Sequence, residues 1–327
     1  MVRPVCEDGG GREGGRVPGR GANGDVRVGT ASWTDRTLIR DSDWYPRRSM
    51  SAEERLRYYA ERFKVVEVDA TYYYPPTAEL AALWTQRTPD DFRMDIKAFS
   101  LLTHHPASPD AVWDDVLADL PVEHQGRRRV YLSHLPSDAV DRAFEHVRTA
   151  LMPLHSAGKL GAVFFQFPPW FRPGRAARDY LAQLPQRLPD YDLAVEFRHR
   201  SWIDGADADR TLDLLEELGL AYVCVDEPQG FETSVPPVVA ATTDRLAVIR
   251  FHGHNRETWE KEGITAAERF AYLYSTEELA QWAARVQQLS VQARETHAIM
   301  NNCYRDYGVR NAAQLAQLLD VRPDPRP

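Results

Sequence analysis

Eight short apolar segments, spaced along the chain from Val26 onward, constrain the fold more than any other feature of the sequence. Segments with helical spacing of apolar residues separate most of them, so the expected order is strand, helix, strand, helix. Strands joined by helical crossovers pair in parallel, and eight such units close into a barrel. The pattern therefore predicts an α/β fold, a TIM-type (β/α)8 barrel, as a single domain with loop insertions. The predicted strands are 26–33, 65–70, 92–98, 161–167, 193–197, 221–226, 246–253 and 297–302.

Two of the predicted helices begin with a capping box, in which a serine and a glutamate three residues later satisfy each other's backbone amides. Ser51 with Glu54 opens one helix, and Ser275 with Glu278 opens another. The connection 227–245 contains Pro and Thr but no convincing helical pattern. This connection is the weakest part of the predicted barrel.

The domain organisation follows from composition along the chain. Residues 1–24 are dominated by Gly and Arg, and they lack the apolar side chains that could offset the entropy of ordering them. We expect a disordered tail there, a barrel domain over 25–322, and a short second tail over 323–327. Two long segments, 103–136 and 253–275, are predicted to be insertions in the barrel loops.

Composition narrows the classes of function. The formal net charge is −8, whereas proteins that bind nucleic acid or anionic membranes generally need an excess of clustered Lys and Arg. Nucleic acid is therefore an unlikely partner. Three cysteines without paired spacing favour neither a disulfide framework nor a cysteine zinc site, and a reducing cytoplasm fits them best. No segment is long and apolar enough to predict a membrane span or a signal core.

The polar residues of the predicted strands alternate with apolar ones. Because successive residues of a strand face opposite sides, one parity packs against the helices and the other points to the barrel axis. The apolar set suits the helices, so we expect the polar set to face inward, close to the strand ends where TIM-barrel sites lie. The inward set predicted in this way includes Glu67, Asp69, Lys97, Glu196, Arg198, Tyr222, Cys224, Asp226, Arg250 and His252.

This pattern yields candidate site residues. Carboxylates and an imidazole can exchange protons, so the candidate catalytic residues are Glu196, Glu67, His252 and Asp226. Cationic, amide and aromatic side chains can hold a polar ligand. The candidate substrate-binding residues are Lys97, Arg198, Arg250, Gln166, His104, Asn301, Asn302, Tyr72 and Trp33.

A purely structural interpretation of the same charges stays open at this point. Lys97 could pair with Glu67, and Arg198 with Asp226, so that the charges only close the top of the barrel. Such buried pairs rarely stabilise a fold more than well-packed apolar residues would. Ionisable groups inside a protein concentrate at functional sites, and we therefore favour a functional cluster.

Several motifs together resemble the YecE-like family, also called domain of unknown function 72. They run in order from about Val26 to Leu319, and the resemblance implies a TIM-barrel fold while leaving the reaction open. The family usually has a neutral amide where this chain has Asp69, which adds negative charge to the predicted site. The motifs are "GTASW" (29–33), "WYP" (44–46), "VEVDATYY" (66–73), "FRMDIKA" with "THH" (92–105), "FFQFPP" (164–169), "VEFRHRSW" (195–202), "IRFHG" (249–253) and "MNN" (300–302).

These observations predict an enzyme that uses acid/base chemistry on a small polar or anionic metabolite, sugar-like or phosphorylated. No cofactor is expected. The first alternative is a hydrolase or isomerase whose divalent metal is bound by Glu67, Glu196, Asp226 and His252. The second is a non-enzymatic module that binds anions or nucleic acid. The sequence does not indicate an oligomeric state.

Overall fold

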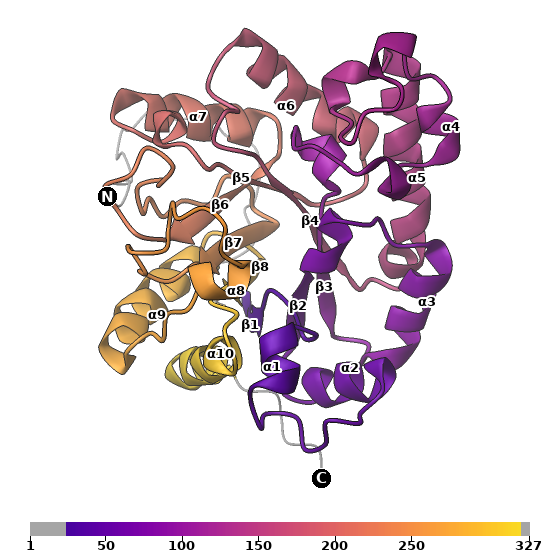
Figure 1. Ribbon diagram of the computed structural model, residues 1–327. Coiled ribbons are helices and arrows are strands. Elements are labelled where there is room, and N and C mark those ends of the chain that lie inside the picture. Colours follow the sequence, from indigo (N-terminus) through magenta and orange to yellow (C-terminus); the bar gives the residue numbers. More distant parts are fainter. Residues whose placement is uncertain (1–23, 322–327) are drawn as a thin grey trace, which may run out of the picture.

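The computed structural model describes residues 24–321, and within them eight parallel strands form one closed barrel in the order of the chain (Figure 1). The predicted (β/α)8 fold is therefore confirmed. The predicted terminal segments 1–24 and 323–327 lie, apart from Gly24, outside the described residues. The strands are β1 (Asp25–Thr30), β2 (Val65–Val68), β3 (Arg93–Lys97), β4 (Leu160–Gln166), β5 (Leu193–Glu196), β6 (Ala221–Asp226), β7 (Leu246–Phe251) and β8 (Glu295–Met300).

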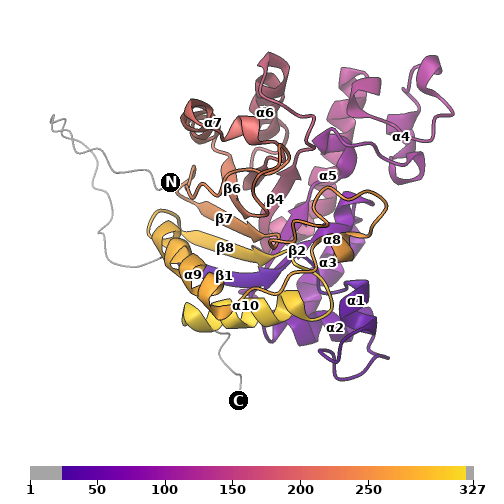
Figure 2. The ribbon, with the colours of Figure 1, turned by 60° about the vertical axis from the view of Figure 1, so that its left-hand side comes forward.

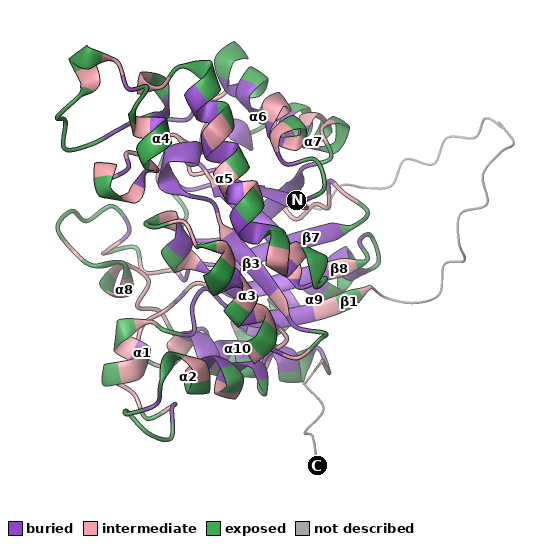
Figure 3. Cartoon of the chain, turned by 90° about the vertical axis from the view of Figure 1, so that its right-hand side faces the viewer, coloured by how far each residue is buried: buried purple, intermediate pink, exposed green. Residues whose placement is uncertain are grey.

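Helices surround the barrel, and short helices lie beyond the ends toward which the strands point (Figure 2). The strands are mostly buried, whereas the exposed residues lie on the loops and on the outward faces of the helices (Figure 3). None of the helices in the described residues is long and apolar enough to cross a membrane. The helices are α1 (Arg36–Arg40), α2 (Ala52–Ala60), α3 (Ala78–Arg87), α4 (Asp114–Leu117), α5 (Ser137–Ser156), α6 (Arg175–Arg187), α7 (Ala206–Glu217), α8 (Ala266–Arg269), α9 (Thr276–Ser290) and α10 (Tyr307–Leu318).

Local sequence signals account for several helix boundaries. The capping boxes predicted at Ser51 and Ser275 are both present, and they begin α2 and α9. Helix α7 ends before Gly219, whose φ of +66° is the left-handed conformation that glycine adopts without strain. Residues 227–245, which join β6 to β7 and are all described by the structure, contain no helix. The weak point of the predicted pattern is thus a real departure from the regular barrel.

The insertion at 103–136 is packed onto the helix layer and does not form a free flap. It contains α4 and several single turns of 3₁₀ helix, and α4 packs against α5. Val116 and Val130 are fully or almost fully buried. Within the insertion the rings of His124 and His134 stack with centroids 3.9 Å apart. This packing adds a second apolar layer outside α5.

Strand pairing fixes which side chains face the barrel axis. Val225 of β6 is level with Arg250 of β7, and Asp226 is level with Phe251. Arg250 contacts carboxylates of β2 and β5 across the barrel, whereas Phe251 packs on Trp282 of α9. Residues level with one another on paired strands face the same side. Val225 therefore faces inward, and Asp226 faces outward.

The predicted parity of β6 was therefore wrong, and the reason lies in its outer covering. The helix-free connection 227–245 covers this strand with exposed backbone and hydroxyl groups. The Ala240 carbonyl accepts from the Cys224 thiol, and Thr242 Oγ1 accepts from the Tyr222 amide at 2.8 Å. The Cys224 thiol and the Tyr222 amide thus find partners in this connection, whereas the Tyr222 hydroxyl is buried without one.

A network of charged side chains fills the end of the barrel at which the strands begin. The Asp95 carboxylate contacts His297 Nδ1 at 3.0 Å, and His297 Nε2 lies 3.2 Å from Glu295 Oε2. Asp95 also accepts from the Ala162 amide where the β3–β4 register shifts. A Cβ on Gly161 would lie 2.2 Å from Asp95 Oδ1, so only glycine fits there. These contacts form the floor of the barrel.

The charge of His297 in this network makes the free energy of unfolding depend on pH. Burial opposes the charged form of His297, but Asp95 and Glu295 outweigh it and raise its pKa from 6.5 to about 9. A raised folded-state pKa contributes stability that is fully present below pH 6.5 and is lost as the pH rises through 9. The contribution is roughly 3 kcal/mol.

We predict that His297→Gln removes this pH dependence. The free energy of unfolding, measured by denaturant titration from about pH 6 to about pH 10, should converge for the two proteins at the alkaline end. Curves that stay parallel over the whole range would show that His297 does not carry the stabilising charge.

Candidate active site at the carboxyl ends of the strands

Arg250 lies at the centre of a buried cluster of charges near the ends of the strands. Its Nε and Nη2 each donate to a different oxygen of Glu67, both at 2.8 Å, and its Nη1 donates to Glu196 Oε2. All three residues are at most 1% exposed. One guanidinium thus joins β7 to β2 and β5 across the barrel, and it has no need of a ligand to balance its charge.

Glu196 collects contacts from four sides. Besides Arg250, its Oε1 accepts from Gln166 Nε2 at 2.7 Å and from Arg198 Nη1 at 3.2 Å. His252 Nε2 lies 3.2 Å from the same oxygen. The end of β5 therefore brings Glu196 inward, where three strands place donors around it.

Arg198 joins Glu196 to Glu227, a residue that the predicted set did not include. Its Nη1 also donates to Glu227 Oε2 at 2.9 Å, and Glu227 Oε1 accepts from the Val235 amide at 2.6 Å. The guanidinium carbon lies 4.7 Å from the centre of the Trp259 ring. Trp259 comes from the 253–275 insertion, which thus covers one side of the cluster.

The three glutamates of the cluster differ in their affinity for protons. Burial raises the pKa of Glu67 and of Glu227 to about 7, although Arg250 and Arg198 respectively oppose the shift. Burial acts on Glu196 as well, but Arg250, His252 and Arg198 outweigh it and hold its pKa well below the usual range. The cluster therefore contains an ionised carboxylate beside two carboxyl groups that titrate near neutral pH.

His252 is a neutral imidazole with a defined orientation. Asn301 Nδ2 lies 2.7 Å from its Nδ1, and because an amide nitrogen only donates, the ring proton is on Nε2, toward Glu196. Burial lowers its pKa to about 3. The ring centre lies 5.6 Å from that of Phe270, another residue of the 253–275 insertion.

Lys97 and Asp69 lie at the edge of the cluster and differ from its other charges. Neither side chain makes an ion pair with any residue of the described chain. Lys97 Nζ lies 4.9 Å from the centre of the Tyr72 ring. Burial and Arg250 lower the pKa of Lys97, and burial raises that of Asp69. Both side chains are partly exposed, so a ligand can reach them.

His104, predicted to bind substrate, lies away from the mouth, and its neighbour His105 lies there instead. His104 is wedged among aromatic rings outside the barrel, with Tyr180 4.4 Å and Phe171 5.2 Å away between ring centres. The left-handed backbone at His104, with φ of 61°, turns His105 the other way. His105 contacts Tyr72 and Trp170, so it is the histidine at the mouth. A sequence of two adjacent histidines gives no signal for choosing between them.

Three more predicted residues lie away from the cluster. Asp226 faces outward and bonds His254 Nε2 at 2.9 Å. Asn302 donates to the Tyr272 carbonyl and to Asn311 of α10, so it holds a helix in place. Trp33 packs edge-on against Trp84 of α3 in the apolar core. The predicted residues that the structure brings together are Glu67, Lys97, Gln166, Glu196, Arg198, Arg250, His252, Asn301 and Tyr72.

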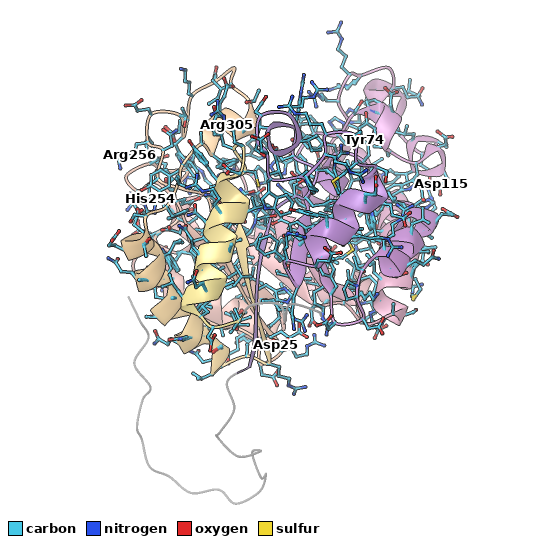
Figure 4. All side chains as sticks on the ribbon, turned by 90° about the horizontal axis from the view of Figure 1, so that it is seen from below. Asp25, Tyr74, Asp115, His254, Arg256 and Arg305 are labelled. Carbon is cyan, nitrogen blue, oxygen red and sulfur yellow. The ribbon has the colours of Figure 1, made fainter. Side chains whose placement is uncertain are left out.

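The surroundings of the cluster show which end of the barrel it occupies. Asp25, at the start of β1, lies at the end of the molecule opposite Tyr74, Arg256 and Arg305, which follow β2, β7 and β8 (Figure 4). The cluster lies with the second group, on the face where TIM barrels carry their sites.

The geometry does not favour the predicted set of metal ligands. Asp226 lies on the other side of β6, and Arg250 binds both Glu67 and Glu196. Among the residues that the structure describes, no group of three or more His, Cys, Asp or Glu side chains is arranged to hold a metal ion.

Comparisons with known proteins agree with the motifs of the sequence. The model of a family described as "Protein of unknown function DUF72" matches residues 27–327. The chain belongs to the DUF72 family. The UPF0759 protein YunF of Bacillus subtilis (strain 168) is 29% identical over 299 residues, which cover 90% of this chain and 95% of YunF. The UPF0759 protein YecE of Escherichia coli (strain K12) is 25% identical over 225 residues, covering 63% and 70% of the two chains.

Solved structures of this family have the same fold. A DUF72 family protein from Thermotoga maritima MSB8 is 30% identical, with a TM-score of 0.69 over 90% of this chain and 99% of that one. A DUF72 family protein from Enterococcus faecalis V583 is 24% identical, with a TM-score of 0.74 over 92% and 99%. The barrel is therefore common to the family.

We predict that Arg250→Met destabilises the fold by about 3–5 kcal/mol, because it leaves two buried carboxylates without their cation. The loss should shrink when the pH is lowered to about 5.5, since the orphaned carboxyl groups can then take up protons. Denaturant titration at both pH values measures the change.

The matched control is Arg245→Met, which removes a half-exposed arginine 2.8 Å from Asp192. Its cost should stay within about 1 kcal/mol. Equal losses for the two variants would contradict the central role of Arg250.

Proposed function

We propose that this protein is an enzyme that uses acid/base chemistry on a small polar or anionic metabolite, sugar-like or phosphorylated, at the carboxyl ends of the strands. One observation carries the proposal. A single nitrogen, Arg198 Nη1, bridges Glu196 Oε1 and Glu227 Oε2, at 3.2 and 2.9 Å. One of these carboxylates stays ionised, and the other titrates near neutral pH. Such a pair can supply a base and an acid in the same turnover.

Arg198 supports an anionic ligand. Arg250 is saturated by its two glutamates and is not available, contrary to the expectation that it binds substrate. Arg198 donates to its two glutamates through Nη1, and its side chain is 15% exposed. Its other nitrogens are suited to a phosphate or carboxylate.

Aromatic side chains at the mouth support a ligand with a flat or sugar-like face. Tyr72 and Trp170 flank His105, and the Trp170 side chain is 60% exposed. Trp259 is buried beneath Arg198 and does not offer a free face. Exposed aromatic faces near charges, such as that of Trp170, are a common means of holding polar rings. We also propose that the protein is cytoplasmic, because its three cysteines have no paired spacing.

We predict that Glu227→Gln abolishes turnover while it preserves ligand binding and the cooperative unfolding transition. The amide keeps the oxygen that accepts from Val235 but cannot transfer the proton. Turnover of a panel of sugar phosphates and small hydroxy and keto acids can be followed by NMR in D2O. Glu232→Gln, on an exposed loop, is the control. Full activity of Glu227→Gln, or binding without turnover in the unmodified protein, would reject the enzyme proposal.

We predict that Arg198→Met weakens the binding of phosphorylated ligands by about 1.5–3 kcal/mol, or roughly 10- to 150-fold, as expected for a hydrogen bond to a charged group. Calorimetric titration with inorganic phosphate and with sugar phosphates measures the change. Arg256→Met, at the same end of the molecule but outside the cluster, should bind unchanged (Figure 4). Equal affinities for the two variants would exclude Arg198 as the anion site.

A further inference from the structure

Lys97 is the amine at the site that the proton transfer does not use. It is the last residue of β3, and its backbone is fixed because Thr71 Oγ1 donates to its carbonyl at 2.7 Å and the Ala98 amide to that of Phe164 at 2.8 Å. Its side chain is partly buried, beside Tyr72. The nitrogen is therefore held at the mouth of the barrel by rigid elements.

The chain contains four lysines, and the other three have ordinary surroundings. Lys64 pairs with Asp91 at 3.2 Å, and Lys159 Nζ donates to two carbonyls, those of Thr85 and Thr88, at 2.7 Å. Lys261 is exposed to water. Within residues 24–321, Lys97 alone combines a position inside the barrel with the absence of a hydrogen bond or an ion pair.

Burial and the charge of Arg250 favour a neutral amine at Lys97. Of the carboxylates near it, Glu67 is bound to Arg250 and Glu196 to both Arg250 and Arg198, and Asp69 is bound to no arginine of the described chain. Burial and the positive charge of Arg250 lower the pKa of Lys97. A lysine that is desolvated beside another cation is the usual form of an amine nucleophile.

We propose that Lys97 is an amine nucleophile that forms an imine with a small aldehyde or ketone carrying an anionic group. This inference rests on the proposed function for the anion, which Arg198 would hold, and it adds the class of substrate. The ligand would be a keto acid or an open-chain sugar phosphate. The imine would lie where the carboxyl groups of the cluster can exchange protons with the substrate.

The chemical step needs no oxidant or reductant. The Nζ lone pair attacks the carbonyl carbon, a C–N bond forms, and the C=O π pair moves to the oxygen, which takes a proton. Nζ then gives up two protons, one to the hydroxyl oxygen and one back to the carboxylate that supplied the first proton. The C–O bond breaks, water leaves, and a C=N bond remains. Asp69, which has no ion-pair partner in the described chain and a raised pKa, is a candidate to supply the proton.

The Tyr72 ring can stabilise the imine once it is protonated, and His105 beside the ring can transfer protons. A protonated imine on Lys97 is a cation, and a ring face 4.9 Å from the nitrogen attracts it as it attracts an ammonium. His105, a neutral imidazole whose ring lies 5.3 Å from that of Tyr72, could pass protons to the departing water.

Reductive trapping tests the proposal on the full chain. The protein is incubated near neutral pH with pyruvate, glyoxylate, glycolaldehyde or glyceraldehyde 3-phosphate and sodium cyanoborohydride, and peptide mass mapping locates the adducts. We expect at least one anionic probe to modify Lys97 about 10-fold faster than Lys64, Lys159 and Lys261, which serve as internal controls. Arg198→Met should slow the anionic probes but not the neutral glycolaldehyde.

Two variants separate this proposal from the proposed function. Lys97→Arg and Lys97→Met both remove the nucleophile, so each should lose trapping at position 97. Both should keep the phosphate binding that depends on Arg198, and both should keep the thermal unfolding transition. Modification of Lys97 no faster than that of the other lysines would overturn the imine, while phosphate binding that still depends on Arg198 would leave the proposed function standing.

Discussion

The ion pair between Arg250 and two buried glutamates is the interaction on which the upper half of the barrel depends. A guanidinium has a fixed planar arrangement of donors, so binding Glu67 through two nitrogens and Glu196 through a third sets the relative positions of β2, β5 and β7. The buried charges are costly unless all are paired. The same contacts leave Arg198 and Lys97 at the edge, where a ligand can reach them.

The fold could be predicted from the sequence because its signals are local and repeated. Each strand is an apolar run with a period of two, and capping boxes mark the start of α2 and α9. The inward charges of β2, β3, β5 and β7 followed from the same period. Side chains such as Glu67, Lys97, Glu196 and Arg250 are therefore near one another for reasons that the sequence displays.

The other site residues could not be predicted from the alternation of polar and apolar positions along the strands. Asp226 and Glu227 are adjacent acids at the end of β6, and the helix-free segment after them decides which one faces the axis. His104 and His105 are separated by one left-handed residue. Nothing in the sequence fixes the pairing of Arg250 with two glutamates, because it arises from strands far apart in the chain.

The floor of the barrel limits how any ligand can come and go. The end where the strands begin is filled by Asp95, His297 and Glu295. Gly161 packs so closely against Asp95 that a Cβ atom would not fit there. Asp95 and His297 are fully buried there, so these side chains close the axis at that end of the described barrel. A ligand near Arg198 is therefore expected to enter and leave from the opposite face, so product and incoming substrate share one opening.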